Sequence, residues 1–275
     1  MMDGVASLPP VAQMMRDCGM MAKKKFGQNF LFDLNLTGRI ARSVPDIDKI
    51  PVVEVGPGPG GLTRALLLAG AKHVIAVEMD KTTEPILSQI TDVADGRLNV
   101  LFADALKTDF SKFGFDEYAI CSNLPYNVGT ELLIQWVHKI ANGEKIKSLT
   151  LMFQREVADR IVARVGDDAY GRLSVLVQLV ADAKILFNVP RTAFTPAPKV
   201  TSAVVQIIPN TTKIKSLGKI ENIEQLTAKL FGMRRKMIRG IMPDVDWTIF
   251  NLAGTERAEN LPPEKFCEIA KKLLP

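Results

Sequence analysis

The chain has 275 residues, 47% of them hydrophobic and 24% charged, which suits one large domain with a small second one and excludes wholesale disorder. No apolar run approaches the roughly 20 residues that span a bilayer, so we expect a soluble protein without a transmembrane helix. The net charge of +5 excludes little, but ten Lys or Arg against two Glu and no Asp lie between Arg191 and Gly240. Such an excess is typical of a polyanion binder or of a solvated basic face.

Cysteine and histidine are scarce. Cys18, Cys121 and Cys267 are far apart and share no metal-ligand spacing, which favours a reducing, cytoplasmic compartment over a disulfide framework. The only two histidines, His73 and His138, are too few for a histidine metal site, and we expect both to be structural or solvated. The composition therefore predicts no metal.

Residues 1–22 look separate from the fold. They contain six methionines without clear periodicity, Asp3 and Asp17 do not suit a transit peptide, and no long apolar core suits a secretory signal. We expect a flexible N-terminal extension, or a true start at Met20 or Met21.

The following part of the chain alternates strands with helices. Val52–Gly56 and His73–Val77 are short, β-branched runs, as in strands buried on both faces of a parallel sheet. Between them, Leu62–Ala69 has helix composition and Gly70 ends it. The alternation continues with strands expected at Leu98–Phe102, Tyr118–Ser122 and Ser148–Phe153, and helices at Thr82–Ile90, Thr130–Ile140 and Glu156–Ala163. This order predicts a doubly wound, Rossmann-like α/β domain with its ligand site at the carboxyl edge of the sheet.

After Ile208-Pro209-Asn210 no further strand run follows. Helix-like stretches lie at Ile223–Phe231, Arg234–Ile241, Trp247–Leu252 and Pro263–Leu273. We therefore expect three parts: the extension at 1–22, the α/β domain at 23–210 and a small all-helical domain at 211–275.

A glycine-rich loop joins the first expected strand to its helix. Gly56, Gly58 and Gly61 let the backbone approach a ligand closely, and the following helix presents free N–H groups to it. Glu78 ends the second strand, 22 residues after Gly56, where a carboxylate can accept hydrogen bonds from both hydroxyls of an adenosine ribose. The loop predicts an adenosine cofactor over a plain turn, but it fits NAD and S-adenosylmethionine equally.

The ends of the third and fourth strands favour one of these cofactors. Asp104-Ala105 follows the third strand, where a carboxylate can accept from the cofactor's adenine amine. The fourth strand ends in Asn123-Leu124-Pro125-Tyr126. A strand stopped by proline is the structural alternative, but at the carboxyl edge these residues face a substrate.

The residue types at this corner suit methylation of an amine. An adenine N6 nitrogen is a poor nucleophile, and hydrogen bonds to the Asn123 side-chain oxygen and the Leu124 carbonyl would hold it facing a methyl donor. Pro125 stiffens the corner without offering an N–H, and Tyr126 can stack on an extruded base. No metal or general base is required, because alignment supplies most of the catalysis.

Several further segments carry a resemblance to a known family. They are Phe26-Gly27-Gln28-Asn29-Phe30-Leu31, Glu54-Val55-Gly56-Pro57-Gly58, Asn123-Leu124-Pro125-Tyr126, Tyr170-Gly171-Arg172-Leu173-Ser174, Phe194-Thr195-Pro196-Ala197-Pro198-Lys199-Val200, Arg234-Arg235-Lys236 and Arg257-Ala258-Glu259-Asn260. In this order, from about Lys24 to the C-terminus, the chain resembles the ribosomal RNA adenine dimethyltransferases. The N-terminal extension departs from that pattern.

The resemblance implies a class I methyltransferase domain that binds S-adenosyl-L-methionine. It implies that Asn29 and Leu31 form a lid over the cofactor, and that Tyr126 and Phe194 sandwich the target adenine, a contact worth about 1–3 kcal/mol per ring. For Phe194 a packed position in a proline-rich turn is the structural alternative. The implied cofactor contacts are Asn29, Leu31, Gly56, Gly58, Glu78, Met79, Asp104, Ala105 and Asn123.

The resemblance also implies a substrate, namely two adjacent adenines in a hairpin loop near the 3′ end of small-subunit rRNA in a pre-ribosomal particle. Arg234, Arg235, Lys236 and Arg239 fall on one expected helix and are predicted to contact rRNA phosphates, with a solvated face as the alternative. We expect a monomer.

Three alternatives stay open. The first is a relative that methylates one large-subunit rRNA adenine. The second is a non-catalytic ribosome-assembly or transcription factor, which the intact Asn123–Tyr126 corner disfavours. The third is an NAD-dependent oxidoreductase, which lacks a proton-relay residue here.

Overall fold

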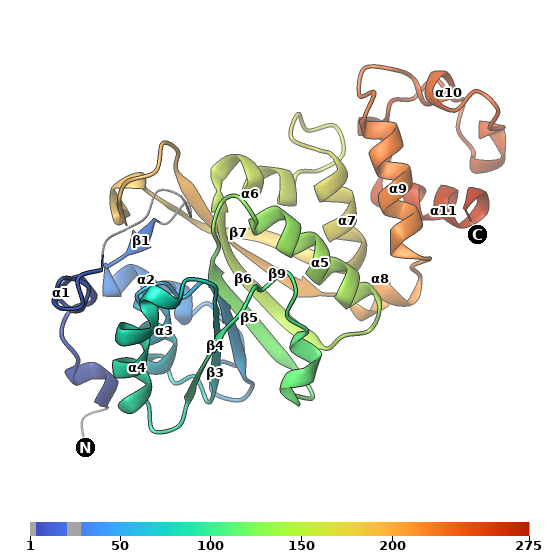
Figure 1. The fold of residues 1–275 in the computed structure, drawn as a ribbon. Helices are drawn as coiled ribbons and strands as arrows, with labels where there is room; N and C mark the ends of the chain where they lie inside the picture. The colour runs from blue at the N-terminus through green and yellow to red at the C-terminus, as the bar shows by residue number, and fades with distance from the viewer. Residues whose placement is uncertain (1–3, 21–28, 275) are drawn as a thin grey trace. The chain divides into compact units, whose positions relative to one another are not determined.

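The computed structural model describes residues 4–20 and 29–274, and it divides into two compact units (Figure 1). The first unit comprises Met1–Leu132, Lys145–Arg155 and Ile185–Ile207, and the second comprises Leu133–Glu144, Glu156–Lys184 and Ile208–Pro275. These limits differ from the break at residue 210 that the sequence suggested. Two segments that precede residue 210, Leu133–Glu144 and Glu156–Lys184, belong to the same unit as the C-terminal helices.

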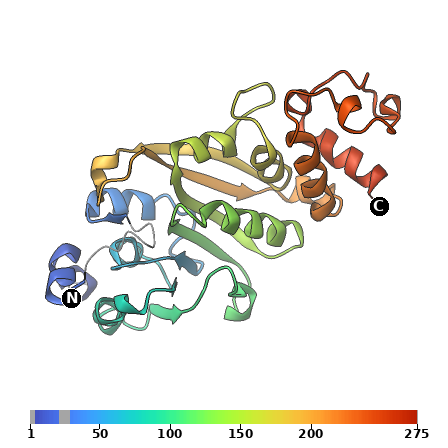
Figure 2. The ribbon, with the colours of Figure 1, turned by 45° about the horizontal axis from the view of Figure 1, so that its top comes forward.

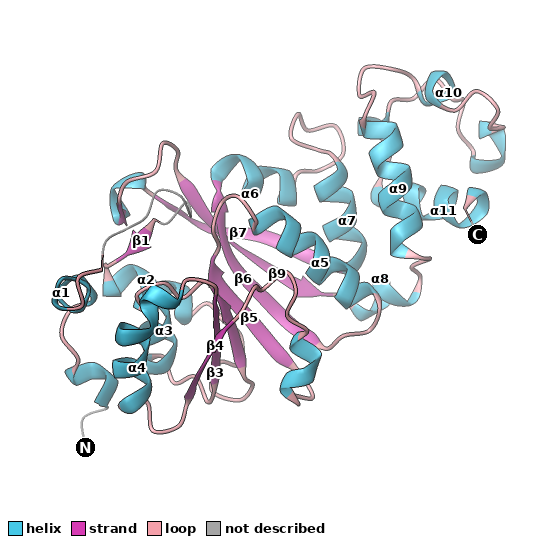
Figure 3. Cartoon of the chain, in the orientation of Figure 1, coloured by secondary structure: helices cyan, strands magenta, loops and turns pink. Residues whose placement is uncertain are grey.

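A seven-stranded, mostly parallel sheet has the strand order β4-β3-β2-β5-β6-β9-β7 (Figure 3). Its parallel part consists of β4 (Leu98–Phe102), β3 (Val74–Glu78), β2 (Val52–Val55), β5 (Tyr118–Asn123) and β6 (Ile146–Gln154). The predicted parallel strands are confirmed. The sequence analysis missed β9 (Ser202–Pro209), which pairs antiparallel with β6, and β7 (Ala181–Val189) at the edge.

The helices of the first unit are α2 (Leu34–Ala41), α3 (Gly61–Leu68) and α4 (Glu84–Asp92), with short 3-10 helices at Lys81–Thr83 and Phe110–Phe113. Two of them, α3 and α4, follow their strands as expected, whereas α2 was not predicted. Aspartates cap three of these turns, because their carboxylates accept the free backbone N–H groups at a helix start. Asp33 accepts from Asn35 N at 2.8 Å, Asp80 from Thr82 N at 3.1 Å and Asp109 from Ser111 N at 3.2 Å.

The N-terminal segment packs onto the first unit. A 3-10 helix (Gly4–Ser7) and α1 (Val11–Asp17) lie beside α3 and α4 in Figures 1 and 2. The Arg64 side chain on α3 is only 2% exposed and donates to the carbonyls of Val5, Leu8 and Pro9. The prediction of a flexible extension is therefore wrong for residues 4–20, because a buried guanidinium and apolar side chains hold them. Residues 1–3 and 21–22 of that extension lie outside the described part.

A separate two-stranded ladder forms one wall of the first unit. β1 (Phe30–Leu31) pairs antiparallel with β8 (Phe194–Thr195), with Leu31 opposite Phe194, and the 3-10 helix Arg191–Ala193 precedes β8. Both phenylalanines and Leu31 belong to the buried hydrophobic core. The pairing brings residues 30 and 31 into contact with the proline-rich segment that the sequence analysis singled out.

The second unit is mostly helical. Its helices are α5 (Gly129–Ala141), which begins in the first unit, α6 (Arg155–Val162), α7 (Arg172–Val180), α8 (Thr211–Lys215), α9 (Ile220–Phe231), α10 (Ile238–Ile241) and α11 (Pro263–Leu273), with 3-10 helices at Trp247–Phe250 and Ala258–Asn260. Apolar side chains on one face of α9, among them Ile223, Leu226 and Leu230, are buried. The expected helical C-terminal part is thus confirmed, although Arg172–Val180 was not foreseen as a helix.

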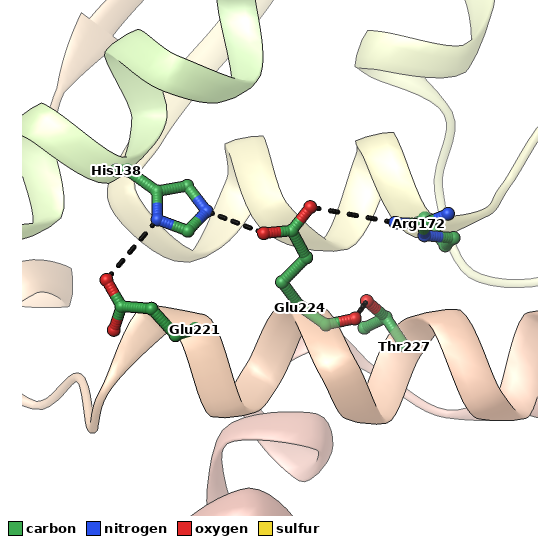
Figure 4. A network of polar contacts seen from close by, with 5 residues as sticks. All are labelled: His138, Arg172, Glu221, Glu224 and Thr227. Carbon is green, nitrogen blue, oxygen red and sulfur yellow. Dashed lines mark hydrogen bonds and ion pairs between the residues drawn. The ribbon is translucent and has the colours of Figure 1, made fainter. Parts of the chain in front are cut away.

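A polar network joins α5, α7 and α9 (Figure 4). His138 Nε2 lies 2.8 Å from Glu224 Oε2, and His138 Nδ1 lies 3.4 Å from Glu221 Oε1. The second Glu224 oxygen lies 3.6 Å from Arg172 Nη2. Both ring nitrogens of His138 face carboxylates on α9. His138 therefore has a structural position, as expected.

Candidate functional site

A cavity of about 240 Å³ opens at the carboxyl ends of β2, β3, β4 and β5 in the first unit. Its lining comes from the loop after β2, the end of β3, the loop after β4, the corner after β5, and β1. Eleven of the twelve predicted catalytic and cofactor-binding residues line it: Asn29, Leu31, Gly56, Gly58, Glu78, Met79, Asp104, Ala105, Asn123, Leu124 and Tyr126. The sheet therefore brings together residues that are up to 97 positions apart in the chain.

The glycine loop forms the centre of the cavity wall. Gly56 and Gly58 have φ angles of 69° and 55°, a left-handed conformation that side chains disfavour. Gly61 opens α3, and a Cβ atom there would lie 2.5 Å from the carbonyl oxygen of Leu31. Glycine at this position lets β1 lie against the loop, where the start of α3 can bind a ligand through its free N–H groups.

Glu78 closes the loop from the side of β3. The backbone N–H groups of Gly58 and Asp80 donate to its two carboxylate oxygens at 2.9 and 2.8 Å. Burial raises the pKa of this carboxyl, and the two N–H donors oppose that effect. Each oxygen keeps a second lone pair, so the carboxylate can also accept from the hydroxyl groups of a ribose.

The loop after β4 supplies another acceptor beside an apolar surface. Asp104 Oδ1 accepts from Leu106 N at 3.0 Å, and Lys107 Nζ lies 3.7 Å from the other carboxylate oxygen. Met79 reaches the same cavity and is 60% exposed. An exposed thioether beside a carboxylate can cover and recognise an adenine ring.

The Asn123–Tyr126 corner begins at the last residue of β5. Asn123 Nδ2 donates to the carbonyl of Asn29 at 3.1 Å, which ties the corner to the segment before β1. The Tyr126 hydroxyl lies 2.7 Å from Ser202 Oγ at the start of β9, and burial raises the pKa of Tyr126. Leu124 is buried. The corner is therefore fixed at both ends, with side chains that can accept from an amine and stack on a ring.

Phe194 does not line the cavity. It is 4% exposed and belongs to the hydrophobic core, where the β1–β8 ladder holds it opposite Leu31. The structure thus gives Phe194 the packed position that was the alternative in the sequence analysis, and its role in stacking stays a prediction.

The basic cluster lies in the second unit. Arg234, Arg235 and Lys236 occupy the turn after α9, and only Arg239 lies on α10, so the prediction that all four share one helix is wrong. The reason is a competing backbone pairing, in which Ile238 N donates to Glu256 O at 2.8 Å and Arg239 N to Gly254 O at 3.0 Å.

All four basic side chains are exposed. Arg234 Nε lies 2.6 Å from Glu259 Oε2, so a carboxylate already orients one member of the cluster. Contact with rRNA phosphates stays a prediction for all four.

Glu54 is a lining residue that the sequence analysis did not select. It lies inside β2, is 1% exposed, and its Oε2 accepts from Thr63 Oγ1 at 2.6 Å. Burial raises the pKa of Glu54 to about 8. A carboxyl within the apolar run Val52–Val55 was the signal available in the sequence, because an acidic residue is rarely buried without a partner.

The lining can hold a cofactor that is cationic and contains adenosine. Three of its carboxyl groups, those of Glu78, Asp80 and Asp104, lie at or just after the carboxyl ends of β3 and β4, and no Lys or Arg lines the cavity among the residues that the structure describes. This charge suits a sulfonium cation better than the pyrophosphate of a dinucleotide.

Within residues 4–20 and 29–274 no three His, Cys, Asp or Glu side chains are grouped as metal ligands. No helix there is long and apolar enough to cross a membrane.

Comparison with known proteins identifies relatives over the whole length. A family model described as ribosomal RNA adenine dimethylase matches residues 19–274. A ribosomal RNA small subunit methyltransferase A of Rhizobium etli is 47% identical over 277 residues, covering 99% of this chain and 100% of the relative. The protein of the same description from Paramagnetospirillum magneticum is 44% identical over 98% of this chain and 96% of its own length. The alignments thus include most of the N-terminal segment, which the sequence analysis had set apart from the family.

Solved structures agree with the fold. A dimethyladenosine transferase from Plasmodium falciparum superposes with a TM-score of 0.73 at 26% identity, over 89% of this chain and 97% of that one. The 23S rRNA methyltransferase ErmE superposes with a TM-score of 0.65 at 23% identity, over 89% and 99%. The second likeness bears on the fold alone.

Proposed function

The chain belongs to the ribosomal RNA adenine dimethylase family, and from this premise we propose that it methylates N6 of two adjacent adenines in a hairpin loop near the 3′ end of small-subunit (16S) rRNA. It is an S-adenosylmethionine-dependent adenine dimethyltransferase that acts on ribosomal RNA. Each adenine receives two methyl groups during ribosome biogenesis. The observation that carries the proposal is the assembly of Glu78, Asp104 and Asn123 around one cavity.

The cofactor is S-adenosylmethionine, which supplies an electrophilic methyl group when it is bound. We assign its ribose hydroxyls to Glu78 and its adenine to Asp104, Ala105 and Met79. The Gly56–Gly58 loop gives close backbone approach, and Asn29 and Leu31 cover the site from β1. The lining carboxylates and the left-handed glycines support this assignment.

Asn123 and Leu124 act on the amine of the target adenine. The Asn123 side-chain oxygen and the Leu124 carbonyl accept hydrogen bonds from N6–H, so the nitrogen lone pair is turned toward the methyl donor. The bond from Asn123 Nδ2 to Asn29 O supports this role, because it leaves the amide oxygen as the free acceptor of that side chain. Catalysis is then mainly alignment, without a general base.

Tyr126 binds the flipped base by stacking. Its hydroxyl is held by Ser202, so the ring enters the reaction already oriented. Phe194 stacks on the opposite face of the flipped base only after it leaves its buried position in the β1–β8 ladder. We therefore assign the first stacking contact to Tyr126 and a later one to Phe194.

The second unit positions the RNA. The exposed Arg234, Arg235, Lys236 and Arg239 contact phosphates of the small-subunit rRNA in a pre-ribosomal particle, which the protein meets as a monomer in the cytoplasm. Phosphate contacts fix register and orientation without reading sequence, which suits a unit separate from the cavity.

A large-subunit rRNA substrate is the second candidate. The likeness to ErmE is one of fold, whereas relatives at 44% to 47% identity over nearly the whole chain are described as small-subunit enzymes. The small-subunit substrate is therefore the one we propose.

Transfer of tritiated methyl groups to purified ribosomal subunits tests this function. Small subunits from a strain that lacks the modification should be labelled and large subunits should not. Asn123→Ala should lose the label, while Asn99→Ala, an exposed position on β4, should keep it. Labelling of large subunits instead would move the protein to the second candidate, and no labelling of either would overturn the enzyme proposal.

A further inference from the structure

Glu54 is a buried acid that the proposed mechanism does not use. It lies in β2 at the centre of the sheet, 1% exposed, and it lines the cavity together with Gly56 and Asn123. Only one of its oxygens has a hydrogen bond among the described residues, the bond from Thr63 on α3. The carboxyl therefore lies in the wall of the cavity with one oxygen held by Thr63 and the other without a hydrogen bond from a described residue.

The surroundings of Glu54 disfavour a negative charge in the empty cavity. The titratable groups that act on it are Glu78 on β3 and Cys121 on β5, and neither supplies a positive charge. No Lys or Arg within the described ranges forms an ion pair with it. Burial raises the pKa of Glu54 to about 8. The charge of Glu78 adds to this effect, and the hydrogen bond from Thr63 opposes it.

The methyl donor and its product differ in charge more than in shape. The donor carries a sulfonium cation in addition to its ammonium and carboxylate groups, and after methyl transfer the sulfur is a neutral thioether. A protonated Glu54 interacts similarly with both molecules, whereas an ionised Glu54 attracts only the sulfonium. In a low-dielectric cavity this difference is large.

We propose that Glu54 distinguishes S-adenosylmethionine from S-adenosylhomocysteine by its own ionisation, releasing its proton when the sulfonium binds and keeping it when the thioether occupies the cavity. This rests on the proposed function. After methyl transfer the cavity loses its positive charge, Glu54 takes a proton back, and the bound product loses its ionic partner. Over one cycle Glu54 loses and regains one proton, and the one net proton per methyl comes from the adenine amine.

Calorimetric binding at pH 7 in two buffers of different protonation enthalpy tests this inference. The wild type should release most of one proton on binding S-adenosylmethionine and none on binding S-adenosylhomocysteine. Glu54→Gln keeps an oxygen for the Thr63 hydroxyl but cannot ionise. It should release no proton, bind the donor about tenfold more weakly, and bind the product nearly as the wild type does.

The affinity for S-adenosylmethionine should change with pH in one direction. Below pH 8 the wild type must lose a proton to bind the donor, so its affinity for S-adenosylmethionine should fall as pH falls, and Glu54→Gln should lack this dependence. Thr63→Val removes the hydrogen bond that lowers the pKa of Glu54, so the loss of affinity for S-adenosylmethionine should begin at higher pH. This variant provides a second test if Glu54→Gln folds poorly.

Asp104→Asn is the matched control, because it faces the adenine that both ligands share and should weaken both equally. Equal weakening of donor and product by Glu54→Gln, or proton release that persists in that variant, would overturn the inference and leave the enzyme function intact. A wild type that binds neither ligand would overturn the proposed function itself.

Discussion

Two glutamates of the cavity wall differ in the hydrogen bonds that oppose the effect of burial on their pKa values. Glu78 accepts from two backbone N–H groups, which stabilise a carboxylate, whereas Glu54 accepts from one hydroxyl. Position in neighbouring strands is thus not enough to assign a role. The donors around each carboxyl decide whether it serves as a fixed acceptor or as a group that responds to charge.

Glu54 should make stability depend on pH. Its pKa of about 8 in the fold, against 4.5 ordinarily, means that the folded protein holds a proton between these values which the unfolded chain has lost. The free energy of unfolding should therefore fall as pH rises from 4.5 to 8. Glu54→Gln should be more stable than wild type by on the order of 3 kcal/mol at pH 7 and nearly equal at pH 4. Urea unfolding at both pH values measures this, and an equal difference at both would contradict it.

Gly61 should be intolerant of a methyl group. It is helical, so Gly61→Ala introduces no strained φ angle, but the new Cβ would meet Leu31 O at 2.5 Å and displace β1 from the cavity. We expect about 1–3 kcal/mol of destabilisation and at least about tenfold weaker binding of S-adenosylmethionine. Gly240→Ala, a helical glycine with nothing within 4 Å, is the control. Unchanged cofactor affinity in Gly61→Ala, measured by calorimetry, would argue against β1 as part of the site.

At the level of elements, the N-terminal segment is held by buried apolar side chains and by one polar side chain of α3. Arg64 satisfies three carbonyls of residues 5–9 at a nearly fully buried position. The same helix begins at the glycine loop, so the segment is attached to the element that forms the cavity. The sequence of residues 1–22 has no clear hydrophobic periodicity, so it did not predict that the segment packs onto the first unit. The hydrogen bonds from Arg64 depend on a residue far along the chain, which local periodicity does not reveal.

Arg64→Met should release this segment. Methionine fills part of the space but removes the donor of all three carbonyls and leaves that of Val5 buried without it, which costs about 1–3 kcal/mol. We expect a lower free energy of unfolding and faster proteolytic removal of residues 4–20, while Arg191→Met, at an exposed position of the same unit, should change neither. Equal protection of the segment in the two variants would show that its apolar side chains suffice.

The basic turn after α9 should contact RNA unevenly. Arg234 is already paired with Glu259, whereas Arg235 and Lys236 are exposed and form no ion pair with a carboxylate within residues 4–20 and 29–274. Arg235→Ala and Lys236→Ala should each reduce the salt dependence of rRNA binding by about one unit of slope. Filter binding at several salt concentrations measures this. A slope that stays at the wild-type value in both variants would assign the RNA contact to another surface.

For the whole molecule, the sequence predicted the parallel strands and the cavity edge because both depend on local patterns. Buried β-branched runs identify β2 and β3, and polar residues directly after strands meet at one edge. The edge strand β7, the antiparallel β9 and the core position of Phe194 depend on pairings between segments outside the local pattern of each strand. The extent of the second unit, which includes Glu156–Lys184, also depends on contacts between distant segments and was not predicted.

The measurement that tests the central claim most directly is mass spectrometry of the 3′ hairpin fragment of 16S rRNA after reaction with the purified protein and S-adenosylmethionine. We predict dimethylated bases at two adjacent adenines with the wild type, and unmodified adenines with Asn123→Ala under conditions where that variant is folded. Full dimethylation by Asn123→Ala, or modification outside the hairpin, would contradict the assignment of the Asn123–Tyr126 corner as the site of methyl transfer.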